Sequence, residues 1–408
     1  MSVSSTSPFP ASPGRAGINP APLAVALLLV VLGAAWLGQA VGWRQAALYV
    51  VGALLGLSLY HAAFGFTSAW RVFIADGRGA GLRAQMIMLA VGVALFFPVL
   101  AAGTLFGTPV KGLVSPAGTS VVVGAFIFGI GMQLGGGCAS GTLYTVGGGS
   151  TRMVVTLLAF IAGSVIGTAH MPFWTSLPQL KPLSLVNELG VAPALALNWT
   201  VFALVYAVTV AVEKRRHGRL VAAHVQPPHA SPWLHGPWPL VAGALALVVL
   251  NFATLALSGR PWGVTSAFAL WGAKAAALLG IDTASWAYWS TKANAAALAA
   301  PVWNDVTSVM DIGIVLGAML AAALAGRWAP VWRLPLRSLV AAVVGGLLLG
   351  YGARLAYGCN IGAYFSGIVS GSLHGWLWLV AAFCGNVAGT RLRPLFGLEV
   401  ERLKPTAC

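Results

Sequence analysis

Two cysteines stand in a glycine-rich segment that occurs twice along the chain. The first copy reads GIGMQLGGGCASG from Gly129 to Gly141, and the second reads GYGARLAYGCNIG from Gly350 to Gly362. The offset is constant through the motif, because 359 minus 138 and 350 minus 129 both give 221. Each copy places its cysteine in a break between apolar stretches. Broken helices at matching places of a duplicated chain indicate a transport site near the middle of a membrane.

A break of this kind leaves backbone N–H groups unpaired and exposes the positive N-terminal ends of half-helices, which stabilise an anion where water is scarce. A cysteine adds a soft, polarizable sulfur with a weak S–H donor, which suits a sulfur-bearing anion better than phosphate. A lone membrane cysteine is usually structural, but Cys138 and Cys359 occupy symmetric positions, which favours a binding role. We expect the neighbouring substrate-binding residues to be Gly136, Gly137, Gly358 and Asn360.

The position five residues before each cysteine differs between the copies, with Gln133 in the first and Arg354 in the second. An arginine at membrane depth is costly and normally has a partner or a function. Arg354 therefore either holds loop carbonyls in place or attracts the anion, and the sequence leaves both interpretations open. We include Gln133 and Arg354 among the expected substrate-binding residues.

The composition indicates which elements position these breaks. Of the 408 residues, 58% are hydrophobic and only 8% are charged, which is too little polar surface for a soluble globule. Fifty-one glycines allow close helix packing and backbone breaks that line a cavity. We expect an all-α polytopic membrane protein built as an inverted pseudo-two-fold repeat with broken or re-entrant helices. It should contain roughly ten to thirteen helical pieces.

Basic residues gather in four short clusters between apolar spans, so the formal charge of +15 is a topology signal rather than a sign of nucleic-acid binding. The positive-inside rule assigns all four clusters to the cytoplasm and places the C-terminus there, with the chain in a bacterial inner membrane. The clusters are residues 71–83, 214–219, 327–337 and 391–404.

The same pattern divides the chain into segments. We expect a disordered tail, a first repeat half, a cytoplasmic connector rich in proline and histidine, a second half and a cytoplasmic tail. Their expected bounds are 1–20, 21–212, 213–235, 236–395 and 396–408.

The charge assignment gives the two cysteine units opposite orientations. The unit from Thr119 to Met171 should start and end on the outer side, and the unit from Leu336 to Arg391 on the inner side. A fainter echo, FGFTSAW at 64–70 and WGVTSAF at 262–268, supports the duplication. The two cysteine loops should therefore enter from opposite faces and meet near the middle.

Other polar residues are predicted to have structural roles. We expect an outer-interface aromatic belt to account for five charged residues, which are Lys274, Asp282, Lys292, Asp305 and Asp311. The histidines show no HxxxH or HExxH spacing, so the sequence predicts neither a metal site nor a cofactor.

The chain resembles the YeeE/YedE family of sulfur-compound permeases in its two cysteine motifs and in FTSAWRVF, over nearly the whole sequence beyond the tail. The resemblance implies uptake of thiosulfate or a related sulfur anion by an hourglass-shaped permease, along a line of thiols that includes Cys138 and Cys359. A further family cysteine falls on Gly65 here, so the relay would lack one thiol. The resemblance also implies a cytoplasmic sulfur carrier of the TusA type as a possible partner.

Two other functions remain open from the residues. A membrane thiol enzyme could handle sulfur covalently, although the sequence offers no CxxC pair of attacking and resolving thiols. A transporter of a soft cation such as Cu(I) would use sulfur ligands, but Met132 alone adds little to the cysteines.

Overall fold

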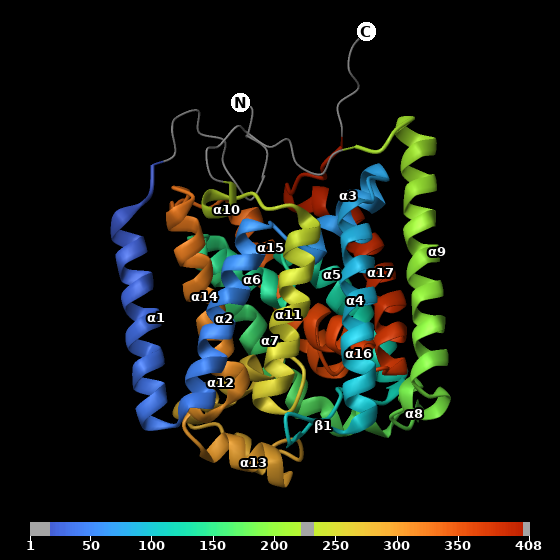
Figure 1. The fold of residues 1–408 in the computed structure, drawn as a ribbon. Coiled ribbons are helices and arrows are strands. Elements are labelled where there is room, and N and C mark those ends of the chain that lie inside the picture. Colours follow the sequence, from blue (N-terminus) through green and yellow to red (C-terminus); the bar gives the residue numbers. More distant parts are fainter. Residues whose placement is uncertain (1–16, 222–231, 403–408) are drawn as a thin grey trace.

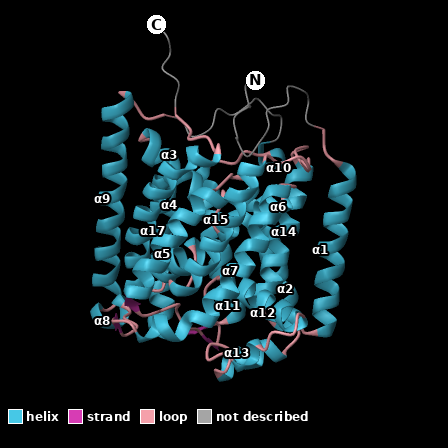
Figure 2. Ribbon diagram, turned by 180° about the vertical axis from the view of Figure 1, so that it is seen from behind, coloured by secondary structure: helices cyan, strands magenta, loops and turns pink. Residues whose placement is uncertain are grey.

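The computed structural model describes residues 17–221 and 232–402, and in this part of the chain the fold is almost entirely helical (Figure 2). This confirms the prediction of an all-α polytopic architecture. The long helices are α1 (Pro20–Ala40), α2 (Trp43–His61), α3 (Phe66–Asp76), α4 (Ala80–Ala102), α5 (Thr119–Gly135), α7 (Thr151–Ser176), α9 (Val191–His217), α11 (Leu240–Ser258), α12 (Thr265–Leu278), α14 (Val306–Leu324), α15 (Leu336–Leu355) and α17 (Leu373–Leu392).

Short elements connect or interrupt these helices. The short helices are α6 (Ala139–Gly147), α8 (Leu185–Leu189), α10 (Pro232–His235), α13 (Lys292–Ala299), α16 (Ser366–Val369) and a π-helical turn over Asn360–Phe365. The strands β1 (Thr104–Leu105) and β2 (Thr108–Pro109) form one antiparallel pair, and β3 (Ala117–Gly118) and β4 (Gln179–Leu180) form another.

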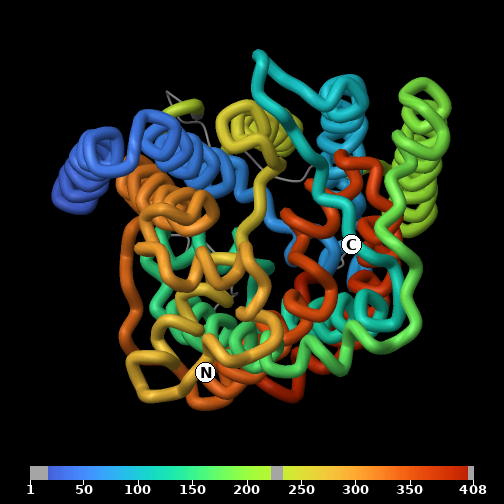
Figure 3. The backbone as a smooth tube through the Cα atoms, turned by 90° about the horizontal axis from the view of Figure 1, so that it is seen from below, coloured from blue at the N-terminus to red at the C-terminus, as the bar shows by residue number. Residues whose placement is uncertain are grey.

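Nine helical spans of the described residues are long and apolar enough to cross a membrane. Helices α1 and α9 lie at opposite edges of the bundle (Figures 1 and 3), and only 11% and 17% of their apolar windows are buried. Central spans such as Trp43–Asp76 reach 72%. The bundle therefore presents apolar helix faces outward, as lipid requires, and keeps its polar groups inside.

The two cysteine units run in opposite directions through the bundle. Helix α5 starts at the end marked by β1 and α8, and α7 returns to that end (Figure 1). Helix α15 starts at the end marked by α3 and α10, and α17 returns there. The chain also places both of its described ends on the α3 side. The helix trios α2–α3–α4 and α11–α12–α14, which carry the FGFTSAW and WGVTSAF echo, show the same reversal.

The units interlock, because α15 packs against both α5 and α7, and α17 packs against α5. Small residues make this possible. A side chain at Gly345 would overlap the backbone of Gly135, so only glycine permits α15 and α5 to approach this closely.

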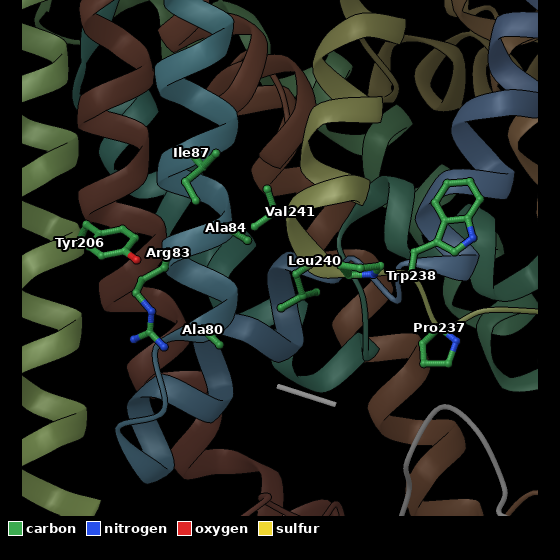
Figure 4. A pocket seen from close by; sticks show the side chains of 10 residues that line it. Ala80, Arg83, Ala84, Ile87, Tyr206, Pro237, Trp238, Leu240 and Val241 are labelled. Atoms are coloured by element: carbon green, nitrogen blue, oxygen red, sulfur yellow. The ribbon is translucent and has the colours of Figure 1, made fainter. Parts of the chain in front are cut away.

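We predicted that the cytoplasmic connector begins at Glu213. Its first residues belong to helix α9, which extends to His217. The Glu213 carboxylate is fully buried and accepts hydrogen bonds from Arg83 Nη1 at 2.6 Å, from Gly79 N at 3.0 Å and from Val221 N at 2.9 Å. These contacts tie α9 to the start of α4. Figure 4 shows Arg83 in a pocket of about 290 Å³ between α4, α9 and α11.

Replacing Glu213 by alanine should lower the thermal stability of the purified protein markedly, because it leaves the Arg83 charge buried without its carboxylate. Breaking a buried pair in this way costs about 3–5 kcal/mol. The measurement is the melting temperature in detergent, followed by tryptophan fluorescence. Glu188→Ala, at an exposed position of α8, is the matched control and should melt like the unchanged protein. Equal melting of both variants would show that the pair does not hold α9.

Candidate functional site

Cys138 directly precedes the short helix α6. Its side chain caps that helix, with Sγ 3.4 Å from Gly141 N and 3.4 Å from Ser140 Oγ. The residue is 2% exposed and belongs to the main core cluster. The thiol therefore lies at the positive end of a half-helix inside the protein, where an anion would be stabilised.

Cys359 has the same relation to the next half-helix. Its Sγ lies 3.4 Å from Ile361 N at the start of the π-helical turn, and the residue is fully buried. The side chain of Asn360 follows it and is also fully buried, yet neither its amide oxygen nor its amide nitrogen has a hydrogen-bond partner. A buried polar group without a partner is costly, so this amide is available to a ligand at the thiol.

The structure brings the two cysteines to one place. Helix α6, which begins after Cys138, contacts the turn Asn360–Phe365 that begins after Cys359. The two thiols are also close enough to act on each other electrostatically. Both thiols thus lie in the protein interior, in breaks that follow α5 and α15, and these two helices start from opposite ends of the bundle.

The glycines next to the thiols shape the two breaks. Gly136 has φ +97° and Gly358 has φ +151°, backbone conformations that side chains rarely allow. A side chain at Gly137 would contact Gly141 and Thr142 N at 3.1 Å, so this glycine lets the chain fold back onto α6. The breaks therefore depend on glycine for geometry as well as for exposed N–H groups.

Gln133 lies away from the thiols, in a buried network at the α3 end. Its Nε2 donates to Asn386 Oδ1 at 2.5 Å and to the Thr67 carbonyl at 3.2 Å, and its Oε1 accepts from Arg71 Nη1 at 3.3 Å. All three contacts connect Gln133 to α3 and α17. These hydrogen bonds give Gln133 a structural role, and its role in substrate binding stays a prediction.

Arg354 occupies the corresponding place in the second unit. Its Nη1 donates to the Tyr288 hydroxyl at 2.8 Å and its Nη2 to Thr265 Oγ1 at 3.4 Å. Gln133 and Arg354 thus both reach the threonine of a Thr-Ser-Ala motif, Thr67 or Thr265. This repeats the internal symmetry at the level of side-chain contacts. Arg354 Nε has no partner, so its contacts do not exclude attraction of an anion.

A second ion pair covers the α3 end of the bundle. Glu401 accepts hydrogen bonds from Arg71 Nε and Nη2, each at 2.5 Å. Burial by itself raises the pKa of the Glu401 carboxyl. The hydrogen bond and the positive charge of Arg71 lower that pKa by more than burial raises it, so the net pKa is below the usual range. Glu401 is therefore an anion at neutral pH, and the described end of the chain is fastened over Arg71 and Gln133.

The position of Asp311 differs from the predicted one. We predicted that it would lie at the outer interface, but the residue is fully buried in α14 and neither carboxylate oxygen has a hydrogen-bond partner. Asp311 is close enough to the Cys359 thiol to act on it electrostatically. The signal in the sequence was a single acidic residue within the apolar run Val306–Leu324, which by itself suggests function.

Comparisons with known proteins give the family of this chain. A family model described as sulphur transport matches residues 61–388. The thiosulfate transporter TsuA of Spirochaeta thermophila is 30% identical over 355 residues, which is 83% of this chain and 95% of that protein. TsuA of Escherichia coli K12 is 26% identical over 354 residues, 82% of this chain and 91% of that protein.

The probable transporter YedE of Escherichia coli K12 is 33% identical over 181 residues. That match covers 43% of this chain and 43% of the relative, so it spans less than half of either protein. The family model covers both cysteines, since Cys138 and Cys359 lie within residues 61–388.

Proposed function

This chain belongs to the sulphur transport family, and we propose that it is a permease that carries a small sulfur-containing anion, thiosulfate or a close relative, into the cell. The family model and the full-length relatives describe transporters, so the alternative of a membrane thiol enzyme is not taken further. The observation that carries the proposal is the meeting of two thiols, each at the N-terminus of an interrupted helix, inside an apolar bundle.

This arrangement suits a sulfur anion in three ways. The half-helix ends supply positive potential without a fixed cation, so binding is weak enough to release the substrate. The thiols of Cys138 and Cys359 offer S–H donors to a sulfur or oxygen acceptor. The unpartnered amide of Asn360 supplies one further donor beside Cys359. We therefore assign substrate binding to these three side chains and to the backbone at Gly136, Gly137 and Gly358.

A route to the α3 end follows helix α6. A pocket of about 170 Å³ lies at the far end of α6 from Cys138 and is lined by Tyr144, Thr145, Tyr60 and Arg327, among others. Tyr144 is close enough to Cys138 to interact electrostatically. Gly65, where the family resemblance implies a further thiol, lies beside Ser68 and the Tyr144 hydroxyl. In our proposal these hydroxyls take the place of the missing S–H donor on the path to the pocket.

The orientation in the membrane is part of the proposal. Arg71 lies within α3, and Lys214, Arg327 and Arg391 lie at or just beyond the ends of α9, α14 and α17. Figure 1 shows these helix ends on the α3 side, which the positive-inside rule assigns to the cytoplasm. We propose that the chain lies in a bacterial inner membrane with its C-terminus inside. A cytoplasmic carrier of the TusA type would then receive sulfur on this side.

Counterflow in proteoliposomes tests the proposal. Vesicles loaded with unlabelled thiosulfate should accumulate labelled thiosulfate transiently, and external thiosulfate should compete more strongly than sulfate or phosphate, because soft sulfur contacts favour it. Vesicles without protein are the control. Equal competition by all three anions, or no counterflow with any sulfur anion, would contradict the proposal.

A further inference from the structure

Asp311 is the buried ionisable side chain that the binding site does not use. It is the sixth residue of α14, and its side chain is fully buried with both oxygens unpartnered. Charging a carboxyl in such surroundings without a cation or a donor is strongly unfavourable. The group is therefore neutral unless its environment changes during transport.

The internal symmetry shows that the fold does not require a carboxyl here. Gln85 is the sixth residue of α4, the helix that corresponds to α14 in the other half. Its Oε1 accepts hydrogen bonds from Trp70 Nε1 at 2.9 Å and from the Tyr364 hydroxyl at 3.5 Å. The equivalent position is thus occupied by an amide that has partners.

The donors that serve Gln85 have no counterparts in the other half. The motif alignments pair Trp70 with Phe268, and Tyr364 with Leu143. Neither Phe268 nor Leu143 carries an N–H or O–H group, so the symmetric position has lost both donors and gained an ionisable group. The combination of a carboxyl and an apolar wall is what a proton-binding site in a membrane requires.

The charges around Asp311 are consistent with proton binding. Among the described residues, Asp305 on α14 acts on Asp311 electrostatically, and Asp311 in turn acts on the Cys359 thiol; neither of these neighbours is a cation. On the helices packed against α14, Tyr49 of α2 donates to the Leu29 carbonyl, and Lys274 of α12 donates to the carbonyls of Leu298 and Ala300.

The remaining titratable groups on these helices lie elsewhere. Arg44 of α2 lies over the Trp43 ring near the start of that helix. Tyr60 and His61 of α2, and His235 of α10, lie around Arg327 near the opposite end of α14. Tyr144 of α6 lines the pocket at that end as well. Arg260, which precedes α12, donates from Nη2 to Thr307 Oγ1 of α14 at 3.4 Å, about one helical turn before Asp311. No cation of the described chain, Arg260 included, forms a hydrogen bond with the Asp311 carboxyl.

A short polar line leads from the surface to Asp311. Asp305 is partly exposed at the start of α14, and its Oδ2 accepts from Ser308 Oγ at 2.7 Å. Ser308 also accepts from Trp271 Nε1 at 2.9 Å and precedes Asp311 by one helical turn. Asp305 and Ser308 thus place polar groups between the end of the bundle opposite the arginine clusters and the turn of α14 that carries Asp311.

We propose that Asp311 binds one proton from the outer side and releases it inward in each cycle, and thereby couples anion uptake to the pH gradient. This inference rests on the proposed permease function. A proton needs no other ligand, whereas a Ca²⁺ or Mg²⁺ ion takes about six or more oxygen ligands. The described residues contain no cluster of three metal-ligating side chains.

The test compares two assays on the same proteoliposomes. With the membrane potential clamped at zero, an inward proton gradient of about one pH unit should concentrate thiosulfate about tenfold in the unchanged protein, for one proton per anion. Asp311→Asn cannot titrate, so it should still perform counterflow but show an accumulation ratio of about one. Asp282→Asn makes the same change at an exposed outer position and should behave like the unchanged protein.

The outcomes separate the two proposals. Absence of counterflow in the unchanged protein would reject the permease function itself. The unchanged protein could instead show normal counterflow while its accumulation of thiosulfate does not depend on the pH gradient, or depends on a sodium gradient. Either result would reject the role of Asp311 but not the permease function. If the asparagine variant is inactive, Asp311→Glu decides: a shifted pH dependence of uptake supports the proposal, and an unshifted one overturns it.

Discussion

Thiosulfate uptake should fall by at least about tenfold when Cys359 is replaced by alanine, and by a similar factor for Cys138→Ala. Each thiol lies at a half-helix N-terminus and would donate to a substrate that carries negative charge. A hydrogen bond to a charged group contributes about 1.5–3 kcal/mol, and each 1.4 kcal/mol corresponds to a factor of ten. The measurement is the initial rate of labelled thiosulfate uptake, normalised to the amount of protein in the membrane.

Two further substitutions make this result specific. Cys384 is exposed on α17, away from the buried pair, so Cys384→Ala should transport normally and serves as the matched control. Cys359→Ser retains a donor of similar size but replaces the soft sulfur with a hard oxygen. If Cys359→Ser takes up thiosulfate as fast as the unchanged protein, hydrogen bonding at this position is sufficient for transport without the sulfur. Normal uptake by both Cys138→Ala and Cys359→Ala would contradict the assignment of substrate binding to these thiols.

Much of the site's framework could be predicted from the sequence because it is repeated. The two Gly-Cys breaks share one offset, and this repeat predicts both thiols at the start of a half-helix. The arginine clusters then gave the two units opposite directions, and the structure has this arrangement. Patterns that repeat, such as glycine breaks and charge clusters, depend on local chemistry and can be interpreted one residue at a time.

Features that depend on which helix faces which could not be predicted in this way. Asp311 is only six residues beyond Asp305, and a short distance along the chain suggested the same interface environment. Whether α14 continues into the core and turns that position inward is decided by its packing against α2 and α6. Similarly, the glutamine at 133 occupies the place of Arg354 in the motif, but Asn386 and Arg71, distant in sequence, determine what it contacts.

The glycines in the last helix of each cysteine unit contribute to the contact between the halves, and their replacement gives the second large effect. Gly163 of α7 lies against Leu347 of α15, and Gly385 of α17 lies against Phe126 of α5. An added Cβ would come within 2.9 Å of the Leu347 Cα in the first case and of the Phe126 carbonyl carbon in the second. Each contact joins one repeat unit to the other, so the repeated glycines are part of the interface between the two halves.

Replacing Gly385 or Gly163 by leucine should therefore prevent assembly of the folded bundle, because the atoms that a side chain would meet are backbone and cannot rotate away. Overpacking of a core costs about 1–3 kcal/mol where side chains can adjust, and rigid helix backbones should raise the cost above that range. We expect a large loss of monodisperse protein in fluorescence-detected size-exclusion chromatography. Gly38→Leu, at an exposed position of α1 where the nearest atom is the Ala46 Cβ at 3.8 Å, should elute like the unchanged protein. If all three variants elute alike, close glycine contacts do not hold the halves together, and the opposed thiols must be positioned by other contacts.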